Sequence, residues 1–200
     1  MIEFTVAINA GGKSTRMGTN KALADVGGQS VIARVLAAVT GLGQRETLLI
    51  TNTPDDYAFL GLPMHADIYP DSGSLGGIFT ALSVSRSPYT LVIACDMPFV
   101  NPDLLRLMLA RAGDGVDVVA PRVDGFPQAL HALYSAACRA PIEASIQQGN
   151  LRIVPIIRGL RAAYLDETDY AAVDPDGTAL MNVNTPDELE QARQIAARSP

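Results

Sequence analysis

The sequence predicts an α/β protein: a single domain with a mostly parallel, twisted sheet of about seven strands and helices on both faces. Short apolar runs rich in β-branched residues alternate with segments of helical spacing, the pattern of strand–helix–strand units. The run over 89–95 is apolar throughout, as expected for a strand covered on both faces. No linker or repeat interrupts the 200 residues, so we assign all of 1–200 to one domain.

The first half of the chain starts with a strand over 4–8 and a glycine-rich stretch over 9–21. Ser30 is placed to cap a helix that ends near Gly41 and Gly43. The same patterns predict four further elements and a loop: strands over 47–51 and 65–69, a short helical segment over 55–60, a second glycine loop over 71–77 and a helix over 78–84.

The second half starts with the strand over 89–95, and Asn101 then caps a helix with Pro102 at its first position. Thr185 and Glu188 form a capping box ahead of the last helix, which runs to about Ala197. Between them we predict strands over 116–120, 128–134 and 162–165, a helix over 136–148 and an acidic irregular segment over 166–176.

Composition excludes several classes of protein. With 48% hydrophobic and 18% charged residues the chain is globular, and a net charge of −6 argues against binding nucleic acid. Glu3 stands where a signal peptide carries positive charge, and no apolar run approaches a membrane span, so we expect a cytoplasmic protein. Cys95 and Cys138 lack metal-binding or redox spacing and are expected to be reduced core residues.

The glycine-rich stretch has the character of an anion site. Gly11 and Gly12 allow backbone N–H groups to approach phosphate oxygens closely. Arg16 and Lys21 lie in the same stretch with a third cation, and no acid appears before Asp25. A glycine-rich surface turn with solvated charges is the alternative, and for an isolated Gly-Gly-Lys it is the better interpretation.

Neither common phosphate motif fits. A P-loop requires glycine where Ala7 stands, and GxGxxG cannot be laid over Gly11, Gly12 and Gly18. What remains, Gly-Gly-x3-Arg-Met-Gly-x2-Lys, resembles the opening signature of the nucleotidyltransferases that include molybdenum cofactor guanylyltransferase. The match runs from Ala10 through Gly18 and resumes at Lys21, but Asn9 replaces the family's usual leucine.

Asp96 directly follows a predicted buried strand, a suitable place for a Mg²⁺ ligand because Mg²⁺ prefers a few oxygen ligands, waters and substrate phosphates. From the residues alone, a turn before Pro98 is as good an interpretation. The resemblance implies more: the family has a metal-binding aspartate in Cys-Asp-x-Pro, matched here by Asp96, and a nucleotide-selecting aspartate before its second glycine loop, matched by Asp71.

Further motifs match as far as the end of the chain. Gly73 and Gly77 match the second glycine loop, and Arg152 matches an arginine near the cofactor site. Asn182 and Asn184 match the family's Asn-x-Asn-Thr-Pro. Taken singly, these residues are more simply turn residues and surface charges. Their combination in the right order is what the resemblance depends on, and it implies a Rossmann-like nucleotidyltransferase fold.

The resemblance implies a reaction in which a terminal phosphate of molybdopterin attacks the α-phosphorus of GTP and pyrophosphate leaves. It implies catalytic roles for Arg16, Lys21 and Asp96, with Mg²⁺ on Asp96 and Asn184. The acceptor is assigned to Arg152 and Asn182. The nucleotide is assigned to Lys21, Asp96 and these residues: Ala10, Gly11, Gly12, Asn52, Asp71, Gly73 and Gly77.

Two points of base recognition stay open. The residue that meets the base at the end of the second strand is Asn52 or Thr51. A carboxylate such as Asp71 can accept from both the amine and the ring N–H of guanine, whereas cytosine offers only an amine there. The residues alone do not choose between GTP and CTP.

Three other functions share these residues. A sister enzyme would use CTP on molybdopterin, and another would use a different phosphorylated acceptor such as a sugar phosphate. From a different class, the protein could be a nucleotide-binding module without catalysis, although Lys21 and Asp96 would then have no purpose. The resemblance also implies transient contact with proteins of cofactor biosynthesis or molybdoenzyme maturation.

Overall fold

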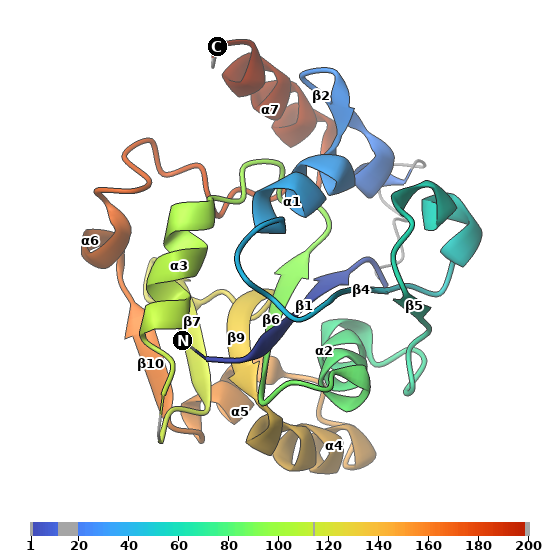
Figure 1. The fold of residues 1–200 in the computed structure, drawn as a ribbon, viewed down its shortest axis with the longest axis vertical. Coiled ribbons are helices and arrows are strands. Elements are labelled where there is room, and N and C mark those ends of the chain that lie inside the picture. Colours follow the sequence, from blue (N-terminus) through green and yellow to red (C-terminus); the bar gives the residue numbers. More distant parts are fainter. Residues whose placement is uncertain (1, 12–19, 114, 199–200) are drawn as a thin grey trace.

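The structure, a computed structural model, describes residues 2–11, 20–113 and 115–198. Among these residues, seven strands form a sheet in the order β10-β7-β9-β6-β1-β4-β5, and β8 pairs with β7 beside it (Figure 1). The strands are β1 (Phe4–Asn9), β4 (Thr47–Ile50), β5 (Met64–His65), β6 (Tyr89–Ala94), β7 (Val118–Val123), β8 (Phe126–Pro127), β9 (His131–Ser135) and β10 (Ala162–Leu165). A separate ribbon pairs β2 (Asp25–Val26) with β3 (Gln29–Ser30).

The sheet is mostly parallel, as predicted. β1 runs parallel to β4 and β6, β4 to β5, and β10 to β7, whereas β9 runs antiparallel to both of its neighbours. β9 is antiparallel to β7 because the connection between them is short and contains only the turn and β8. A parallel crossover needs a dozen or more residues.

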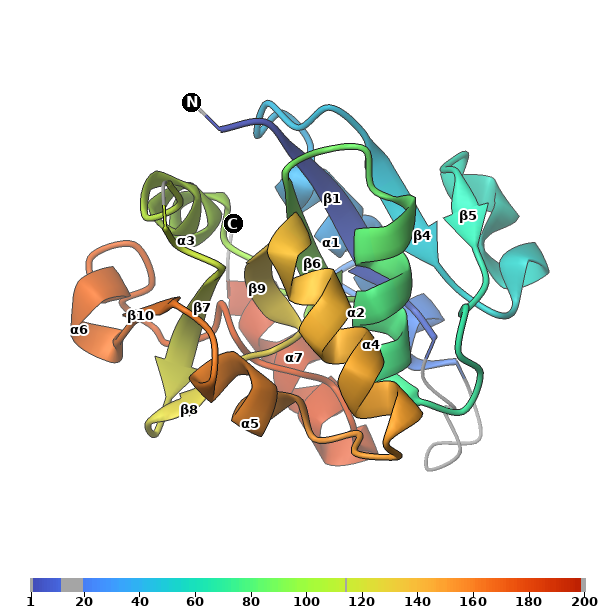
Figure 2. The same ribbon diagram turned by 90° about the horizontal axis from the view of Figure 1, so that it is seen from below.

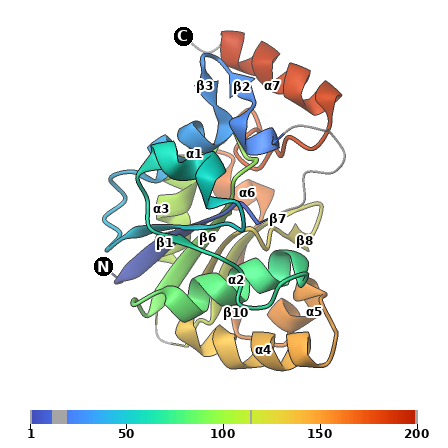
Figure 3. The ribbon, with the colours of Figure 1, turned by 90° about the vertical axis from the view of Figure 1, so that its right-hand side faces the viewer.

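Helices cover both faces, so the predicted fold class is confirmed. The helices are α1 (Val31–Val39), α2 (Gly73–Val84), α3 (Pro102–Ala110), α4 (Arg139–Gln147), α5 (Ile153–Arg158), α6 (Glu167–Tyr170) and α7 (Pro186–Arg198), with short 3₁₀ turns at Lys21–Leu23, Pro54–Leu60 and Ala136–Cys138. α2 and α4 lie side by side on one face (Figure 2). α7 lies beside the β2–β3 ribbon, across the sheet from α4 and α5 (Figure 3). No helix among the described residues is long and apolar enough to cross a membrane.

Two apolar clusters fill the spaces above and below the sheet. Alternate residues of β6 divide between them: Leu91 and Ile93 belong to the cluster under α1 and α3, and Val92 belongs to the cluster under α2 and α4. All three are fully buried. The continuous apolar run of this strand is therefore explained by burial on both faces.

Two of the differences from the sequence prediction concern β5 and the start of α2. The strand expected over 65–69 is only β5, because the next N–H groups bond side chains instead of β4: Asp67 N donates to Asn52 Oδ1 at 2.9 Å and Ile68 N to Thr80 Oγ1 at 2.9 Å. The second glycine loop was also placed wrongly. Gly73 is the first residue of α2, so the glycines at 76 and 77 lie inside the helix.

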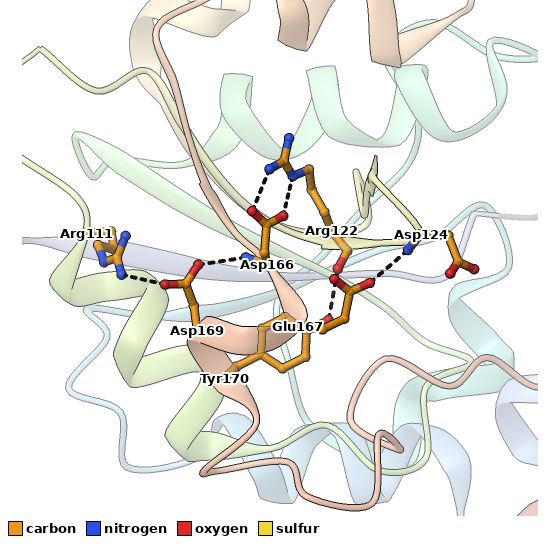
Figure 4. Close-up of polar contacts among 7 residues, drawn as sticks. All are labelled: Arg111, Arg122, Asp124, Asp166, Glu167, Asp169 and Tyr170. Carbon is orange, nitrogen blue, oxygen red and sulfur yellow. Dashed lines mark hydrogen bonds and ion pairs between the residues drawn. The ribbon is translucent and has the colours of Figure 1, made fainter.

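The segment after β10 is more ordered than its composition predicts. Asp166 and Asp169 form a capping box that opens α6. Asp166 also holds Arg122 of β7 through two hydrogen bonds of 2.6 Å, and Tyr170 Oη donates to the Arg122 carbonyl at 2.9 Å (Figure 4). Glu167 accepts from the backbone N–H of Asp124 at 2.8 Å. These contacts fasten α6 and the β7–β8 turn to one another at the edge of the sheet.

His131, at the start of β9, is an unusual core residue. It is fully buried, and neither ring nitrogen has a hydrogen-bond partner among the described residues. Burial lowers its pKa to about 3, because a charged ring would lose its hydration. The ring is therefore neutral in the folded protein.

This burial predicts a loss of stability in mild acid. Between about 3 and the usual histidine pKa of about 6.5, the unfolded chain binds a proton that the folded chain excludes, so acid favours unfolding. Denaturant titrations at about pH 7.5 and about pH 5.5 measure the effect, and His131→Leu should remove about 1.4 kcal/mol of the loss between them. An equal loss in the variant would show that His131 does not contribute.

Candidate active site

The glycine-rich stretch and Asp96 enter the site from adjacent strands. β1 and β6 are parallel, with Asn9 opposite Ala94, so both end at the same edge of the sheet. The Cys95 N–H donates to the Asn9 carbonyl at 3.1 Å and extends the pairing by one residue. The two motifs thus meet at the carboxyl edge, where ligands of parallel sheets bind.

Lys21 contacts a residue from the far end of the chain. It follows Asn20, whose side-chain oxygen caps the 3₁₀ turn by accepting from the Ala22 N–H at 3.2 Å. Lys21 Nζ donates to Asn184 Oδ1 at 3.1 Å. The structure therefore brings together the residues that were assigned to the triphosphate and to the metal.

Asp96 lies beside this pair. Its backbone carbonyl accepts from the Val183 N–H at 2.8 Å, which holds the segment containing Asn184 against the end of β6. Burial raises the pKa of the Asp96 carboxyl; the charge of Lys21 opposes this shift and that of Glu188 increases it. A carboxylate in such surroundings would be stabilised by additional positive charge.

Glu188 is a site residue that the sequence identified only as part of a helix cap. The predicted capping box is present: Glu188 Oε2 accepts from the Thr185 N–H at 2.8 Å, and Thr185 Oγ1 accepts from the Glu188 N–H at 3.2 Å. The same oxygen also accepts from the Asn184 N–H at 2.6 Å. Glu188 therefore fixes the backbone of Asn184 as well as contributing negative charge near Asp96.

A hollow of about 390 Å³ opens beside these residues. Asn182, Asn184 and Glu188 line one part of it; the remaining lining residues are Asp176, Gly177, Thr178, Met181, Gln191 and Ile195. Arg152 does not join them. It directly precedes α5, which lies across the sheet from α7, the helix that follows Asn182 and Asn184 (Figure 1).

The oxygen atoms near Asp96 could supply part of the ligand set of Mg²⁺. Carboxylate and amide oxygens are ligands that Mg²⁺ accepts, and burial disfavours the charged form of the Asp96 carboxyl, which a bound cation would stabilise. Within residues 2–11, 20–113 and 115–198 no group of three or more acidic, histidine or cysteine side chains could hold a metal on its own. The residues present therefore fit an ion that takes most of its ligands from substrate phosphates and water.

A second polar group lies on the other side of β1, at the ends of β4 and β5. Asn52 Nδ2 donates to Asp67 Oδ2 at 2.8 Å, and the Asp67 N–H donates back to Asn52 Oδ1 at 2.9 Å. Thr51 is buried and its hydroxyl accepts from the Thr53 N–H at 3.1 Å, so Asn52 is the residue that contacts Asp67.

Sequence reasoning missed Asp67. Its Oδ1 is buried and has no hydrogen-bond partner among the described residues. A methyl group on Gly11 would stand 3.2 Å from Asp67 Oδ2, so the carboxylate lies against the start of the glycine-rich stretch. The rule that singled out Asp96, an acid just after a strand, could have found it had β5 been predicted to end at His65.

The backbone N–H groups of Ala10 and Gly11 already have hydrogen-bond partners within the protein. The Ala10 N–H donates to the Ile50 carbonyl at 2.8 Å, and the Gly11 N–H donates to Asn9 Oδ1 at 3.2 Å. Contacts of these two residues with a nucleotide would therefore use their carbonyl oxygens. Gly12 and Arg16, which were also assigned to the site, lie outside the described residues.

The residues matched to the family's second glycine loop and the aspartate before it differ in their burial. Asp71 has a φ of 62° and is exposed just before α2. Gly73, with a φ of 55°, is exposed at the first position of that helix. Gly77 is buried, and a Cβ there would lie 2.5 Å from Asn9 Nδ2, so this glycine makes room for a side chain of β1.

A family model and several curated relatives match most of this chain. The MobA-like NTP transferase domain matches residues 6–168. A probable molybdenum cofactor guanylyltransferase of Pelotomaculum thermopropionicum is 36% identical over 199 residues, which cover 100% of this chain and 96% of that protein. A molybdenum cofactor guanylyltransferase of Desulfosudis oleivorans is 34% identical, covering 96% and 95% of the two chains.

A solved structure is similar along the whole chain. The molybdopterin-guanine dinucleotide biosynthesis protein A of Archaeoglobus fulgidus superimposes with a TM-score of 0.82 at 27% identity, covering 97% of this chain and 99% of that one. The family model thus matches most of the chain, and the structure of this similar protein has the same fold. The chain belongs to the MobA-like NTP transferase family.

Proposed function

We propose that this protein transfers GMP from GTP to the terminal phosphate of molybdopterin and releases pyrophosphate. The proposal is supported by the names of its relatives and by one structural observation, the Lys21–Asn184 hydrogen bond beside the partly buried Asp96 carboxylate. This pairing joins a cation suited to phosphates with oxygens suited to Mg²⁺. We place the reaction in the cytoplasm, in keeping with the two free cysteines.

In this reaction an oxygen of the acceptor phosphate attacks the α-phosphorus of GTP. A new P–O bond forms to the acceptor, the bond to the β-phosphate breaks, and the electron pair leaves with pyrophosphate. Such transfers depend on in-line positioning and on stabilising the charge of the phosphates. Lys21 supplies a positive charge for the triphosphate and the departing pyrophosphate, and Arg16 has the same role in the proposal.

Asp96 and Asn184 would hold Mg²⁺, which when bound acts as a Lewis acid toward phosphate oxygens. Glu188 prepares the site for this by fixing the Asn184 backbone through its 2.6 Å hydrogen bond. When the triphosphate enters, Lys21 Nζ can exchange Asn184 Oδ1 for phosphate oxygens and so release the amide oxygen. The same residues thus serve the free and the loaded site.

We assign recognition of the base to the group around Asp67. Guanine presents two adjacent donors, the ring N–H and the exocyclic amine, and a carboxylate can accept from both. Asp67 Oδ1 is a buried acceptor without a partner among the described residues, and Asn52 holds the other oxygen at 2.8 Å. Cytosine offers a single amine at that position, so an acceptor of this kind favours GTP over CTP.

The acceptor side is assigned to the hollow that Asn182 lines. Asn182 and Asn184 come from one segment, so a molybdopterin phosphate seated there would lie next to the proposed metal ligands. Arg152, which directly precedes α5, keeps its proposed role only if the acceptor extends from this hollow toward α5. In this proposal the base lies on one side of the end of β1, and the triphosphate and the acceptor lie together on the other side.

Calorimetric titration with GTP, CTP, ATP and UTP, each with and without Mg²⁺, tests the assignment. We expect GTP to bind best, and Asp67→Asn to weaken GTP by about 10- to 100-fold because one strong acceptor is lost. Asp71→Asn is the matched comparison and should leave the preference for GTP unchanged.

If instead Asp71→Asn lost the preference for GTP and Asp67→Asn retained it, Asp71 would be the residue that recognises the base, as the sequence predicted. Preference of the wild type for CTP would instead indicate the sister transferase. Binding of GTP without release of pyrophosphate when molybdopterin is supplied would indicate a nucleotide-binding module.

A further inference from the structure

A buried polar side chain lies at the carboxyl end of the central strand β1, at the first residue of the glycine-rich stretch. Asn9 ends β1, paired with Ile50 of β4 on one side and with Ala94 of β6 on the other. Its exposed fraction is only 8%. Burying an amide costs free energy unless its polar groups form hydrogen bonds, so this side chain needs an explanation.

The Asn9 side chain holds the first peptide of the glycine-rich stretch. Its Oδ1 accepts from the Gly11 N–H at 3.2 Å. Only the oxygen of an amide group can accept, so this bond fixes the amide with Oδ1 toward Gly11 and Nδ2 turned away. The side chain is therefore oriented by the backbone it contacts.

Helix α2 is shaped to admit this side chain. A Cβ at Gly77 would lie 2.5 Å from Asn9 Nδ2, 2.7 Å from Oδ1 and 2.8 Å from Cγ. Such distances are too short for any side chain, so an alanine at 77 would push the Asn9 amide away from Gly11. Asn9 and Gly77 thus act as a pair.

The hydrogen bond also determines where the preceding carbonyl points. In a trans peptide the C=O and N–H groups point in opposite directions, and no cis peptide occurs among the described residues. Because the Gly11 N–H is directed at Asn9, the Ala10 carbonyl is directed away from it. Gly11 is also flanked by Asp67, whose Oδ2 would lie 3.2 Å from a Cβ on Gly11.

We propose that Asn9 is a positioning residue for the nucleotide base. By holding the Gly11 N–H it orients the Ala10 carbonyl as a second acceptor beside Asp67, before any nucleotide arrives. The inference rests on the proposed function, since it concerns how the same site receives GTP. It gives Gly77 a role through Asn9 instead of a direct contact with the nucleotide.

The test compares ligands that carry the base with one that lacks it. Asn9→Ala removes the acceptor, and we expect the dissociation constants of GTP and GMP to rise about three- to tenfold while that of pyrophosphate changes less than about twofold. Gly77→Ala should give the same selective loss. In the Asn9→Ala background, Gly77→Ala should not raise the dissociation constants of GTP and GMP further, because the added methyl group then fills the space that the Asn9 amide has left.

Thermal unfolding of each variant identifies any that fail to fold, and Asn9→Ser, which retains a hydroxyl acceptor, serves as a milder second variant. Equal loss of GMP and pyrophosphate, or unchanged GMP binding in a folded variant, would overturn the proposal. Additive losses from Asn9→Ala and Gly77→Ala would also overturn it. If wild-type protein bound no nucleoside triphosphate, the proposed function would fail first and this inference with it.

Discussion

Replacing Asp96 with asparagine should lower the rate of guanylyl transfer at least about a thousandfold, while the fold stays intact. Asparagine has nearly the same shape but lacks the charge that would hold Mg²⁺. The side chain is partly buried, and burial already disfavours its charged form, so the neutral amide is easily accommodated. Steady-state kinetics measure the loss, and thermal unfolding should give a midpoint no lower than that of the wild type.

The matched control for Asp96→Asn is Glu190→Gln. Glu190 is exposed on α7 and the substitution removes one negative charge as well, but Glu190 is not among the groups that shift the pKa of Asp96. We expect wild-type turnover from it. Wild-type turnover from Asp96→Asn would remove this carboxylate from the mechanism.

Lys21→Met should raise the dissociation constant of GTP by about 100-fold and that of GMP by about tenfold or less. Methionine keeps the apolar stem of lysine but loses the charge that we propose faces the β- and γ-phosphates. The loss of the bond to Asn184 Oδ1 should have little effect on stability, because it is one hydrogen bond at a partly exposed site. Titrations with GTP and GMP measure the difference between the two ligands.

An exposed cation elsewhere provides the control for this variant. Arg86→Met, in the turn between α2 and β6, removes the same charge without approaching the site, and it should bind both nucleotides as the wild type does. If Lys21→Met weakened GTP and GMP by the same factor, its proposed contact with the outer phosphates would be wrong.

Much of the fold could be predicted because its signals are local. The apolar run of β6 shows burial on both faces, and Asn101 caps α3 as expected by accepting from the Asp103 N–H at 2.8 Å. β5 is shorter than predicted because Asn52 and Thr80 take the N–H groups that would have continued the strand. Partners 12 and 15 residues distant are not visible in a local pattern.

The candidate site was predictable to the extent that its residues lie at strand ends or in motifs. Asp96, Lys21 and Asn184 come together as expected. Asp67 was missed because the predicted strand ran past it, and Glu188 was missed because its capping role already explained it. Glu188 influences Asp96 because the Val183–Asp96 backbone hydrogen bond holds the segment before α7 at the end of β6, and a contact between such distant residues is not visible in the sequence.

The most direct test of the proposed function is a transfer assay with GTP labelled at the α-phosphorus. Purified protein, Mg²⁺ and molybdopterin should give a labelled dinucleotide and one pyrophosphate for each GMP transferred. Label that moves only from CTP, or GTP that is consumed without label reaching molybdopterin, would contradict the account.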